Sequence, residues 1–475
     1  MKNKVKKISS NIYEIKQEEN MNTPVRIFAS KKIFDNIKDN SIQQIKNIAS
    51  LPGIQKYPIT MPDIHQGYGF PIGGVGAFDL KTGIITPSGI GFDINCGVRL
   101  LLTNLNINDL RPSIITNLLE SINKYIEIGI NSQSKETLSL RELDEILLNG
   151  LNAMLKKGFA LKDDINNCEE NGCMNVETSK VVSQKAKARG QKHLGTLGSG
   201  NHFIDILSVD EIFDKKIASV YSLKKDQIVI MIHTGSRGLG HQIAKDYIEK
   251  IKQINTKNKI KNIDKDLLYV PINSKIGQDY FNAMKCASNF AWSNRQMITY
   301  YIRKVFKEYF PQSKLDLLYD LSHNIAKIET HKIDDKEIEL CVHRKGATRA
   351  FPPFHNQIPQ KYKEVGQPII LPGSMGTNSY VLAGQKDSMK KTFGSCAHGA
   401  GRSCSRSQAQ QIFNFREIQK DITSKNITIL KSNKKLLIQE GPLAYKNIDD
   451  VLNVITQENI AQLVAKLKVI GVIQS

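Results

Sequence analysis

The stretch Gly89-Ile-Gly-Phe-Asp-Ile-Asn-Cys-Gly-Val-Arg99 combines a carboxylate, Asp93, and a thiol, Cys96, with closely spaced glycines. Glycine accepts backbone angles that other residues avoid, so the chain can turn sharply here and come close to a ligand. A carboxylate and a thiolate three residues apart can then face one cation. The alternative is a buried cysteine in a glycine-rich turn before a strand over 98–103, because free cysteine is among the most buried residue types.

The same local pattern, a ligand-type residue beside glycine at the end of a predicted strand, recurs along the chain. It is found at Asp93, Cys96, His202, His233 and His323. One such histidine is weak evidence, because a histidine in a turn is more often an ordinary hydrogen-bonded residue. A structural zinc site takes its ligands in close pairs, whereas these are far apart in the sequence, as in active sites built from several loops. The pattern therefore favours an open, catalytic metal site.

The composition indicates a cytoplasmic protein with an anionic partner. The chain has 475 residues, of which 40% are hydrophobic, and 66 Lys plus Arg against 46 Asp plus Glu give a net charge of +20. This excess attracts polyanions, so nucleic acid leads the expected partners, although many of the lysines are scattered. The seven cysteines have no disulfide-framework spacing, which indicates a reducing compartment. No signal peptide and no apolar run of membrane-spanning length is found.

Periodicity predicts a mixed α/β fold. Helices are expected over 41–48, 108–130, 140–157 and 278–310, and strands over 25–29, 227–232, 317–322 and 338–342. Glycines and prolines interrupt any helix after Met61, which places Asp63 and His65 in an ordered loop. Because no repeat, linker or composition break appears, residues 1–475 are predicted to form one large domain with a central metal-binding cleft. Cys168 and Cys173 have the spacing of half a zinc site but no second pair nearby.

His398 has a different setting, because it lies among small residues with Arg402 close behind. Imidazole can attack phosphorus and form a phosphoramidate where cations neutralise the phosphate oxygens and a metal aligns the leaving group. A sixth metal ligand is the alternative. Three cations, Arg344, Lys345 and Arg349, lie within six residues and suit phosphate binding, because guanidinium groups grip oxygens in pairs.

Together these motifs resemble those of the RtcB-type ligases, which join RNA 3′-phosphate or 2′,3′-cyclic phosphate ends to 5′-hydroxyl ends. The motifs cover the chain from about residue 50 to its end, in family order. They are Met61-Pro-Asp-Ile-His-Gln-Gly-Tyr-Gly-Phe-Pro-Ile-Gly-Gly-Val, Phe92-Asp-Ile-Asn-Cys-Gly-Val-Arg, Gly198-Ser-Gly-Asn-His-Phe, His233-Thr-Gly-Ser-Arg-Gly-Leu-Gly, Ser322-His-Asn-Ile-Ala, His343-Arg-Lys-Gly-Ala-Thr-Arg-Ala-Phe-Pro-Pro, Pro372-Gly-Ser-Met-Gly and His398-Gly-Ala-Gly-Arg.

The resemblance implies a mixed α/β domain with a basic cleft and a three-step reaction that needs GTP and two Mn²⁺ ions. A cyclic end is opened to a 3′-phosphate, and His398 takes GMP from GTP. The 3′-phosphate then accepts this GMP, and the 5′-hydroxyl displaces it. The resemblance makes Cys96 the bridge between the two ions and places Asp63 near the reacting ends. The implied metal ligands are Asp93, Cys96, His202, His233 and His323.

The resemblance also implies residues for the nucleotide and the RNA. Those for GTP are Asn201, Asp205, Asn324, Pro372, Gly373, Ser374, Met375, Gly399, Ala400, Gly401, Tyr445 and Gln474. Those for RNA phosphates are Arg237, Arg344, Lys345, Arg349 and Arg402. The chain departs from the family pattern at Gln474, where relatives carry a lysine near the guanine, and at Asp205, where many have glutamate. A Cys/His-rich site binds Zn²⁺ more tightly than Mn²⁺, so zinc should inhibit.

Two other functions fit part of this pattern. A guanylyltransferase that caps RNA or DNA 3′-phosphates without efficient joining would need the same residues. A catalytically idle RNA-binding protein would gain nothing from keeping the ligands and His398. Lysine-nucleotidyl ligases are disfavoured because no Lys-x-Asp-Gly tetrapeptide occurs in the sequence. The expected partners are RNA with 3′-phosphate or cyclic phosphate and 5′-hydroxyl ends, GTP and an archease-type activator, with no membrane contact.

Overall fold

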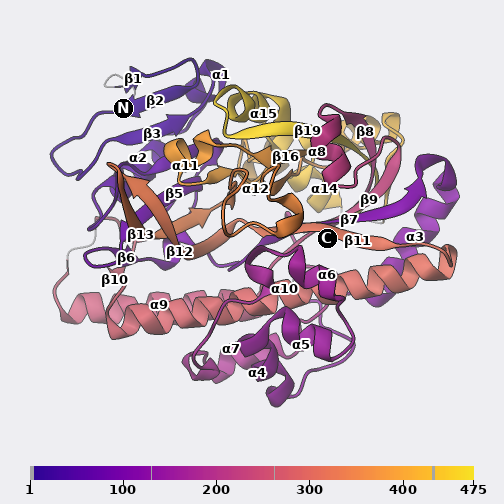
Figure 1. The fold of residues 1–475 in the computed structure, drawn as a ribbon, viewed down its shortest axis with the longest axis horizontal. Coiled ribbons are helices and arrows are strands. Elements are labelled where there is room, and N and C mark those ends of the chain that lie inside the picture. Colours follow the sequence, from indigo (N-terminus) through magenta and orange to yellow (C-terminus); the bar gives the residue numbers. More distant parts are fainter. Residues whose placement is uncertain (1–4, 130, 261–262, 431–433, 475) are drawn as a thin grey trace.

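The computed structural model describes residues 5–129, 131–260, 263–430 and 434–474, which form two large β-sheets with helices around them (Figure 1). The first sheet holds the N-terminal strands and one later hairpin. Its strand order is β1 (Val5–Lys7), β2 (Ile12–Ile15), β3 (Val25–Phe28), β4 (Ile59–His65), β5 (Ile72–Asp79), β13 (Lys336–Lys345) and β12 (Asn324–Ile333). The mixed α/β fold expected from the sequence is confirmed.

The second sheet holds most of the remaining strands and is almost entirely antiparallel. Its order is β11 (Leu315–Ser322), β7 (Gly97–Asn106), β9 (Gln227–Thr234), β8 (Phe203–Ile212), β19 (Ala461–Gln474), β16 (Ser379–Gly384) and β15 (Pro368–Leu371), with β18 (Thr428–Ile429) parallel to β19. Two short pairs complete the strands: β6 (Ile84–Ile85) with β10 (Val270–Pro271), and β14 (Ala347–Arg349) with β17 (Ser395–Ala397). His323 is the single residue between β11 and β12, so the chain crosses there from one sheet to the other.

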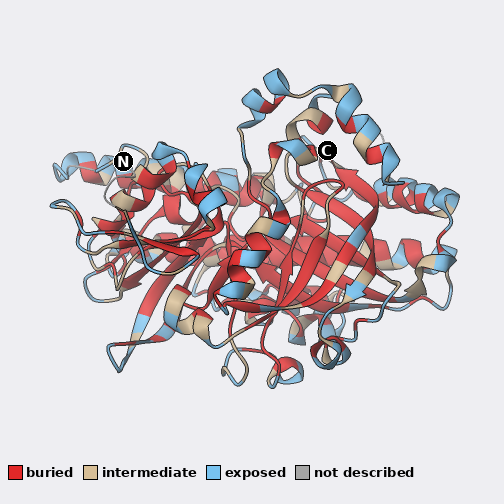
Figure 2. Cartoon of the chain, turned by 90° about the horizontal axis from the view of Figure 1, so that it is seen from above, coloured by how far each residue is buried: buried red, intermediate tan, exposed pale blue. Residues whose placement is uncertain are grey.

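Helices cover both faces of the second sheet. On β9, Ile230 and Ile232 pack with α3 and α10, whereas Met231 belongs to the cluster that contains residues of α8 and α13. The helices are α1 (Lys31–Asp35), α2 (Asp39–Ala49), α3 (Pro112–Tyr125), α4 (Leu140–Asn149), α5 (Leu151–Lys156), α6 (Lys162–Asn166), α7 (Gln184–Gly190), α8 (Lys215–Val220), α9 (Arg237–Lys257), α10 (Lys275–Tyr309), α11 (Asp387–Thr392), α12 (Arg406–Ile412), α13 (Phe415–Ser424), α14 (Lys434–Glu440) and α15 (Ile448–Gln457). Strands are buried along most of their length, and exposed residues gather on the outer helices (Figure 2). None of the described helices has the length and apolar character needed to cross a membrane.

The prediction of a loop around Asp63 is wrong, because Asp63 and His65 belong to β4. Prolines are usually confined to strand edges and bulges, since they cannot donate a ladder hydrogen bond. Here Pro62 lies where the register between β4 and β5 shifts, between Thr60 and His65. The irregular pairing therefore lets the strand continue through a proline that the sequence pattern marks as a breaker.

The long helix predicted over 278–310 is α10, which runs across the width of the molecule below the sheets (Figure 1). Its Arg295 is fully buried and donates Nη2 to Asp320 Oδ1 at 2.8 Å. The same guanidinium donates Nη1 to the carbonyl oxygens of Asn95 at 2.9 Å and Thr234 at 2.8 Å. Arg99 donates to the other Asp320 oxygen at 2.7 Å. One buried carboxylate thus joins α10, β7 and β11.

Replacing Asp320 with alanine should destabilise the protein strongly, because two buried guanidinium groups would lose their charged partner. Removing one member of a buried ion pair typically costs about 3–5 kcal/mol of unfolding free energy. The measurement is the denaturant midpoint of Asp320→Ala against that of Asp35→Ala, which breaks the exposed pair with Lys31. Equal midpoints for the two variants would show that the buried pair does not hold the fold together.

Candidate metal and nucleotide site

Four neighbouring antiparallel strands bring the predicted metal ligands to one edge of the second sheet. His323 follows the end of β11, and Cys96 immediately precedes β7. On the next two strands, His233 lies at the end of β9, and His202 immediately precedes β8. Alternate strands of an antiparallel sheet start and end at the same edge. The register agrees, because Gly97 pairs with Ser322 and His233 pairs with Val98 and Phe203.

The donor atoms of these residues form two groups that share Cys96. The first group is Asp93, Cys96 and His202, and the second is Cys96, His233 and His323. The distances are 2.8 Å from His202 Nε2 to Asp93 Oδ2, 3.4 Å from Cys96 Sγ to His202 Nε2, 3.3 Å from Cys96 Sγ to His233 Nε2, and 3.4 Å between the Nε2 atoms of His233 and His323. A shared thiolate between two groups fits two neighbouring cations.

The chemistry of these donors also fits metal ions. Burial lowers the pKa of His233 and His323 well below the usual value, which keeps both imidazoles in the neutral form that binds metals. Burial and then Asp93 raise the pKa of the Cys96 thiol, so an ion would have to displace its proton. The Asp93 Oδ1 atom is buried and has no hydrogen-bond partner among the described residues. A thiolate, three imidazoles and a carboxylate are ligands of borderline transition metals.

The absence of a side chain at Gly235 leaves room for the Asp93 carboxylate. The Cβ of any other residue at position 235 would lie 2.5 Å from Asp93 Oδ1, closer than real contacts allow. Asn95, in the same turn, has a left-handed backbone with φ of 52°, and Arg295 bonds both its carbonyl and its side chain. Asparagine is among the residues that adopt this conformation most readily. The turn that carries Asp93 and Cys96 is therefore shaped by contacts behind it.

His398 follows β17 and is oriented by Asp63 of β4. One oxygen of that carboxylate, Oδ2, accepts the backbone N–H of His398 at 3.0 Å and its ring Nδ1–H at 2.5 Å. With the proton on Nδ1, the lone pair of the imidazole is on Nε2. The His398 ring lies 5.0 Å from the His323 ring, measured between centroids, so it borders the metal-ligand groups. This pair has the base–orienter geometry of nucleophilic catalysis.

A cavity of 430 Å³ contains His398 and four of the predicted metal ligands in its wall. All of the residues that the resemblance implies for GTP line it: Asn201, Asp205, Asn324, Pro372, Gly373, Ser374, Met375, Gly399, Ala400, Gly401, Tyr445 and Gln474. The structure brings these residues together, while their role in binding stays a prediction. His202 is buried behind the wall of the cavity.

Two of these residues offer polar atoms to a ligand. Asp205 is buried, its Oδ1 has no hydrogen-bond partner among the described residues, and burial raises its pKa well above the usual value. Its neighbour at the same sheet edge, Gln474, pairs with Phe203 and donates Nε2 to the carbonyl oxygen of Gly200 at 3.0 Å. A buried carboxylate without a partner is costly, so a ligand with N–H groups would improve this site.

Two of the arginines predicted to contact phosphate are buried in ion pairs. Arg344 is fully buried and forms a two-pronged ion pair with Glu329, at 2.6 and 2.8 Å. Arg349 is also buried and pairs with Glu169 and Glu170. Both guanidinium groups are satisfied by acids that are distant in the sequence, which leaves neither free for phosphate. A phosphate could reach either guanidinium only by displacing its acid, so neither arginine is a favoured phosphate contact.

The other three predicted cations lie close to the cavity. Lys345 lines it and donates to the carbonyl oxygens of Tyr68 and Phe70, and burial lowers its pKa to about 7. Arg402 also lines it and pairs with Glu440 at 2.9 Å. Arg237 contacts Thr196, Gly129 and Ser132 beside Asp93. Phosphate binding by these three stays a prediction.

Sequence reasoning missed one acidic residue of the site. Glu440 is buried in the cavity wall and pairs with Arg402 and Arg406, and it also accepts a hydrogen bond from the Tyr445 hydroxyl. It ends an ordinary amphipathic helix, α14, and has no glycine-rich motif around it. The residues before Glu440, Leu-Leu-Ile-Gln, contain no motif that would mark it as a site residue. Cys168 and Cys173, by contrast, belong to neither metal-ligand group of the described residues.

Replacing Cys96 with alanine should reduce the Mn²⁺ stoichiometry and abolish activity, because both donor groups use this thiol. The loss of thermal stability should be small, on the order of 1 kcal/mol, since only one small group is removed. Cys286→Ala is the matched control, because Cys286 is equally buried on α10 and belongs to neither group. Titration calorimetry and unfolding of both variants decide the matter. Unfolding with unchanged Mn²⁺ stoichiometry would make Cys96 a core residue instead.

Comparison with known proteins agrees with this geometry. Residues 44–475 match the family model described as tRNA-splicing ligase RtcB. The tRNA-splicing ligase RtcB of Thermococcus kodakarensis is 45% identical over 474 residues, 98% of each chain, and that of Methanococcus maripaludis is 45% identical over 480 residues, 100% of each chain. RNA-splicing ligase RtcB homolog 1 of Entamoeba histolytica is 45% identical over 440 residues, 91% of this chain and 83% of the relative. The family expected from the motifs is confirmed, and the chain belongs to the RtcB family of tRNA-splicing ligases.

Proposed function

We propose that this protein is a GTP-dependent RNA ligase that joins 3′-phosphate or 2′,3′-cyclic phosphate ends to 5′-hydroxyl ends, in tRNA splicing or RNA repair. The observation that carries the proposal is His398, with Nδ1 bound to Asp63 in the wall of a cavity that also contains two groups of metal ligands. A nucleophile, an orienting carboxylate and a cation site in one cavity suit phosphoryl or nucleotidyl transfer.

His398 is the proposed nucleophile. Its Nε2 lone pair attacks the α-phosphorus of GTP, a P–N bond forms, and the P–O bond to pyrophosphate breaks. Asp63 keeps the other nitrogen protonated and stabilises the positive charge that develops on the ring. The proposed role of Asp63 is therefore to orient His398. The family resemblance implied only that Asp63 lies near the reacting RNA ends.

The metal ligands and the RNA ends complete the proposal. Two Mn²⁺ ions held by Asp93, Cys96, His202, His233 and His323 would neutralise phosphate charge and align the leaving group. An oxygen of the RNA 3′-phosphate attacks the phosphorus on His398, and the P–N bond breaks to give a 3′-pp-G end. The 5′-hydroxyl then attacks the RNA phosphorus and GMP leaves. Lys345, Arg402 and Arg237 are the proposed phosphate contacts that remain.

Recognition of the base is assigned to Asp205 and Gln474. Burial favours the neutral Asp205 carboxyl, as its raised pKa indicates, and the N–H groups of a bound guanine edge would favour the ionised form by donating to it. Adenine does not offer these groups in the same arrangement. The Gln474 amide donates to Gly200, so its oxygen is left to face the cavity. A lysine at this position would donate only, and would favour the guanine carbonyl. We place the protein in the cytoplasm and leave an archease-type activator among its proposed partners.

The proposal is tested by incubating the protein with α-labelled GTP and Mn²⁺, and then with RNA that has a 3′-phosphate. His398→Ala should lose the acid-labile GMP adduct, still bind Mn²⁺, and still seal RNA that already carries a 3′-pp-G end. His355→Ala is the control, because His355 lies on Phe351 and does not line the cavity. Full adduct formation by His398→Ala would exclude it as the nucleophile. An adduct without joining would favour the capping guanylyltransferase.

Replacing Gln474 with lysine should tighten GTP binding and raise the preference for GTP over ATP. A charged hydrogen bond exceeds a neutral one by about 1 kcal/mol, or several-fold in affinity. Adduct formation with both nucleotides is measured for wild type, Gln474→Lys and Gln462→Lys, which makes the same change at the exposed start of β19. If Gln474→Lys and the control behave alike, Gln474 does not read the base, and Asp205, Tyr445 or backbone groups do.

A further inference from the structure

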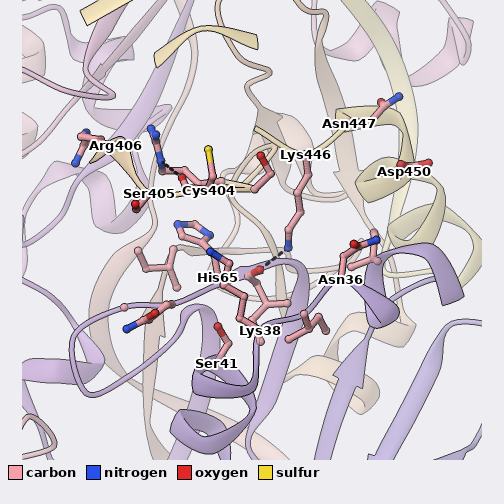
Figure 3. Close-up of a pocket in the computed structure, with 18 of the residues that line it drawn as sticks. Asn36, Lys38, Ser41, His65, Cys404, Ser405, Arg406, Lys446, Asn447 and Asp450 are labelled. Atoms are coloured by element: carbon pink, nitrogen blue, oxygen red, sulfur yellow. Dashed lines mark hydrogen bonds between the residues drawn. The ribbon is translucent and has the colours of Figure 1, made fainter. Parts of the chain in front are cut away.

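A second and larger cavity, of 1100 Å³, forms a groove beside the one that contains His398. One wall of the groove is formed by α1, the start of α2 and the end of β4. The other wall comes from the segment 402–407, α12 and the start of α15. Figure 3 shows Lys38 and Ser41 facing Ser405 and Cys404 across this space, with His65 between them. None of the residues predicted as metal ligands lines this groove.

The groove is continuous with the catalytic cavity. His65, Ile72 and Arg402 line both spaces. The centroid of the His65 ring lies 6.5 Å from that of the His398 ring, so the inner end of the groove opens beside the proposed nucleophile. A chain-like ligand lying in the groove could therefore place its end at His398.

The lining of the groove suits a polyanion. Five cations line it, Lys32, Lys38, Arg402, Arg406 and Lys446. Lys32 pairs with Asp450, and Arg402 and Arg406 share Glu440, so the five cations exceed their two acids by three charges. Serine, asparagine and glutamine side chains between them can bond to phosphates and sugars. Among the described residues that line the groove there is no phenylalanine, tyrosine or tryptophan. The groove therefore offers mainly contacts to a sugar-phosphate backbone.

The inner end of the groove presents a hydrogen-bond acceptor. His65 Nδ1 lies 2.9 Å from the backbone carbonyl oxygen of Asp63, and a carbonyl can only accept, so Nδ1 carries the proton. The other ring nitrogen, Nε2, then has a lone pair. A ribose 2′-hydroxyl can donate to it, whereas a deoxyribose cannot. Lys446 holds the same end of β4 through the carbonyl oxygens of Pro62 and Ile64.

We propose that this groove binds the last nucleotides of the RNA strand that carries the 3′-phosphate, with the 2′-hydroxyl of its terminal ribose on His65. The inference rests on the proposed function, and it assigns to this groove one of the two RNA strands that are joined. The groove leads to His398 and contains no metal ligand, and in the proposed reaction the 3′-phosphate is the end that must reach the phosphorus on His398. The 5′-hydroxyl strand must then enter by another route.

Negative charge introduced on each of the two walls tests the groove. Lys38 is exposed and bonds only to Gln408 in the described structure, and Gln410 is exposed on α12. Lys38→Glu and Gln410→Glu should each weaken binding of a single strand with phosphates at both ends by about five- to tenfold. Lys38→Glu should also flatten the salt dependence by about 0.7 in slope. Lys216→Glu, on α8 and outside the groove, makes the same charge change as a control.

A second strand with hydroxyls at both ends identifies the occupant. Binding is measured without GTP, so that no chemistry occurs, and unfolding midpoints check that the variants are folded. If Lys38→Glu and Gln410→Glu weaken binding of the doubly phosphorylated strand and leave binding of the strand with hydroxyl ends unchanged, the assignment stands. If they weaken only the hydroxyl strand, the groove holds the 5′-hydroxyl strand and the assignment is overturned. If they weaken both strands equally, the groove does not select the 3′-phosphate strand, and the assignment is again overturned. If they affect neither strand, the groove binds no RNA.

The terminal sugar tests His65 separately. Wild type should bind a 3′-phosphate strand ending in ribose several-fold more tightly than one ending in 2′-deoxyribose, and His65→Phe should remove this difference. Because the readout is a ratio, a general loss of affinity does not imitate it. A ratio unchanged in His65→Phe would overturn the sugar contact. The GMP adduct of wild type, formed without RNA, tests the proposed function independently, because the adduct does not need the groove.

Discussion

The buried carboxylate of Asp320, held between Arg99 and Arg295, is the contact on which the site depends most. It lies near the end of β11, just before His323, and its two arginines come from β7 and α10. Arg295 extends the contact to the backbone carbonyls next to Cys96 and His233. Ion pairs in an interior are expensive to desolvate, so such an arrangement gains most when it fixes geometry. Here it ties the backbone beside three predicted metal ligands to one rigid helix.

The positively charged side chains of this protein fall into two groups, those buried in ion pairs and those along the groove. The chain is strongly basic, yet several of its arginines in the family motifs are turned inward and neutralised by Glu329, Glu169 and Glu170. Arg344 thereby joins β13 to β12, and Arg349 joins β14 to the segment 169–170. The excess of cations that an anion would meet lies instead along the groove walls, where Lys38 has no acidic partner among the described residues. Net charge therefore predicts the class of partner better than it predicts which side chains touch it.

Local patterns in the sequence identified the elements with strong periodicity and the residues with unusual chemistry. The apolar strand β9, the long helix α10 and the helices after β7 were predicted correctly, as was the family. What failed depends on partners far along the chain. Pro62 lies at a register shift in β4 that only pairing with β5 creates. The Arg344 guanidinium is paired with Glu329, which lies on the neighbouring strand β12. Glu440 could not be found, since nothing around it differs from an ordinary helix end.

The crossing at His323 has a mechanical consequence. Because one residue joins β11 to β12, there is no spare chain to absorb a sliding motion between the two sheets. Any relative displacement of the sheets would be transmitted directly to His323, while Cys96 and His233 stay with the second sheet. Packed interiors shift between discrete arrangements and do not stretch smoothly. The distances from His323 to Cys96 and His233 therefore depend on how the two sheets are positioned relative to each other.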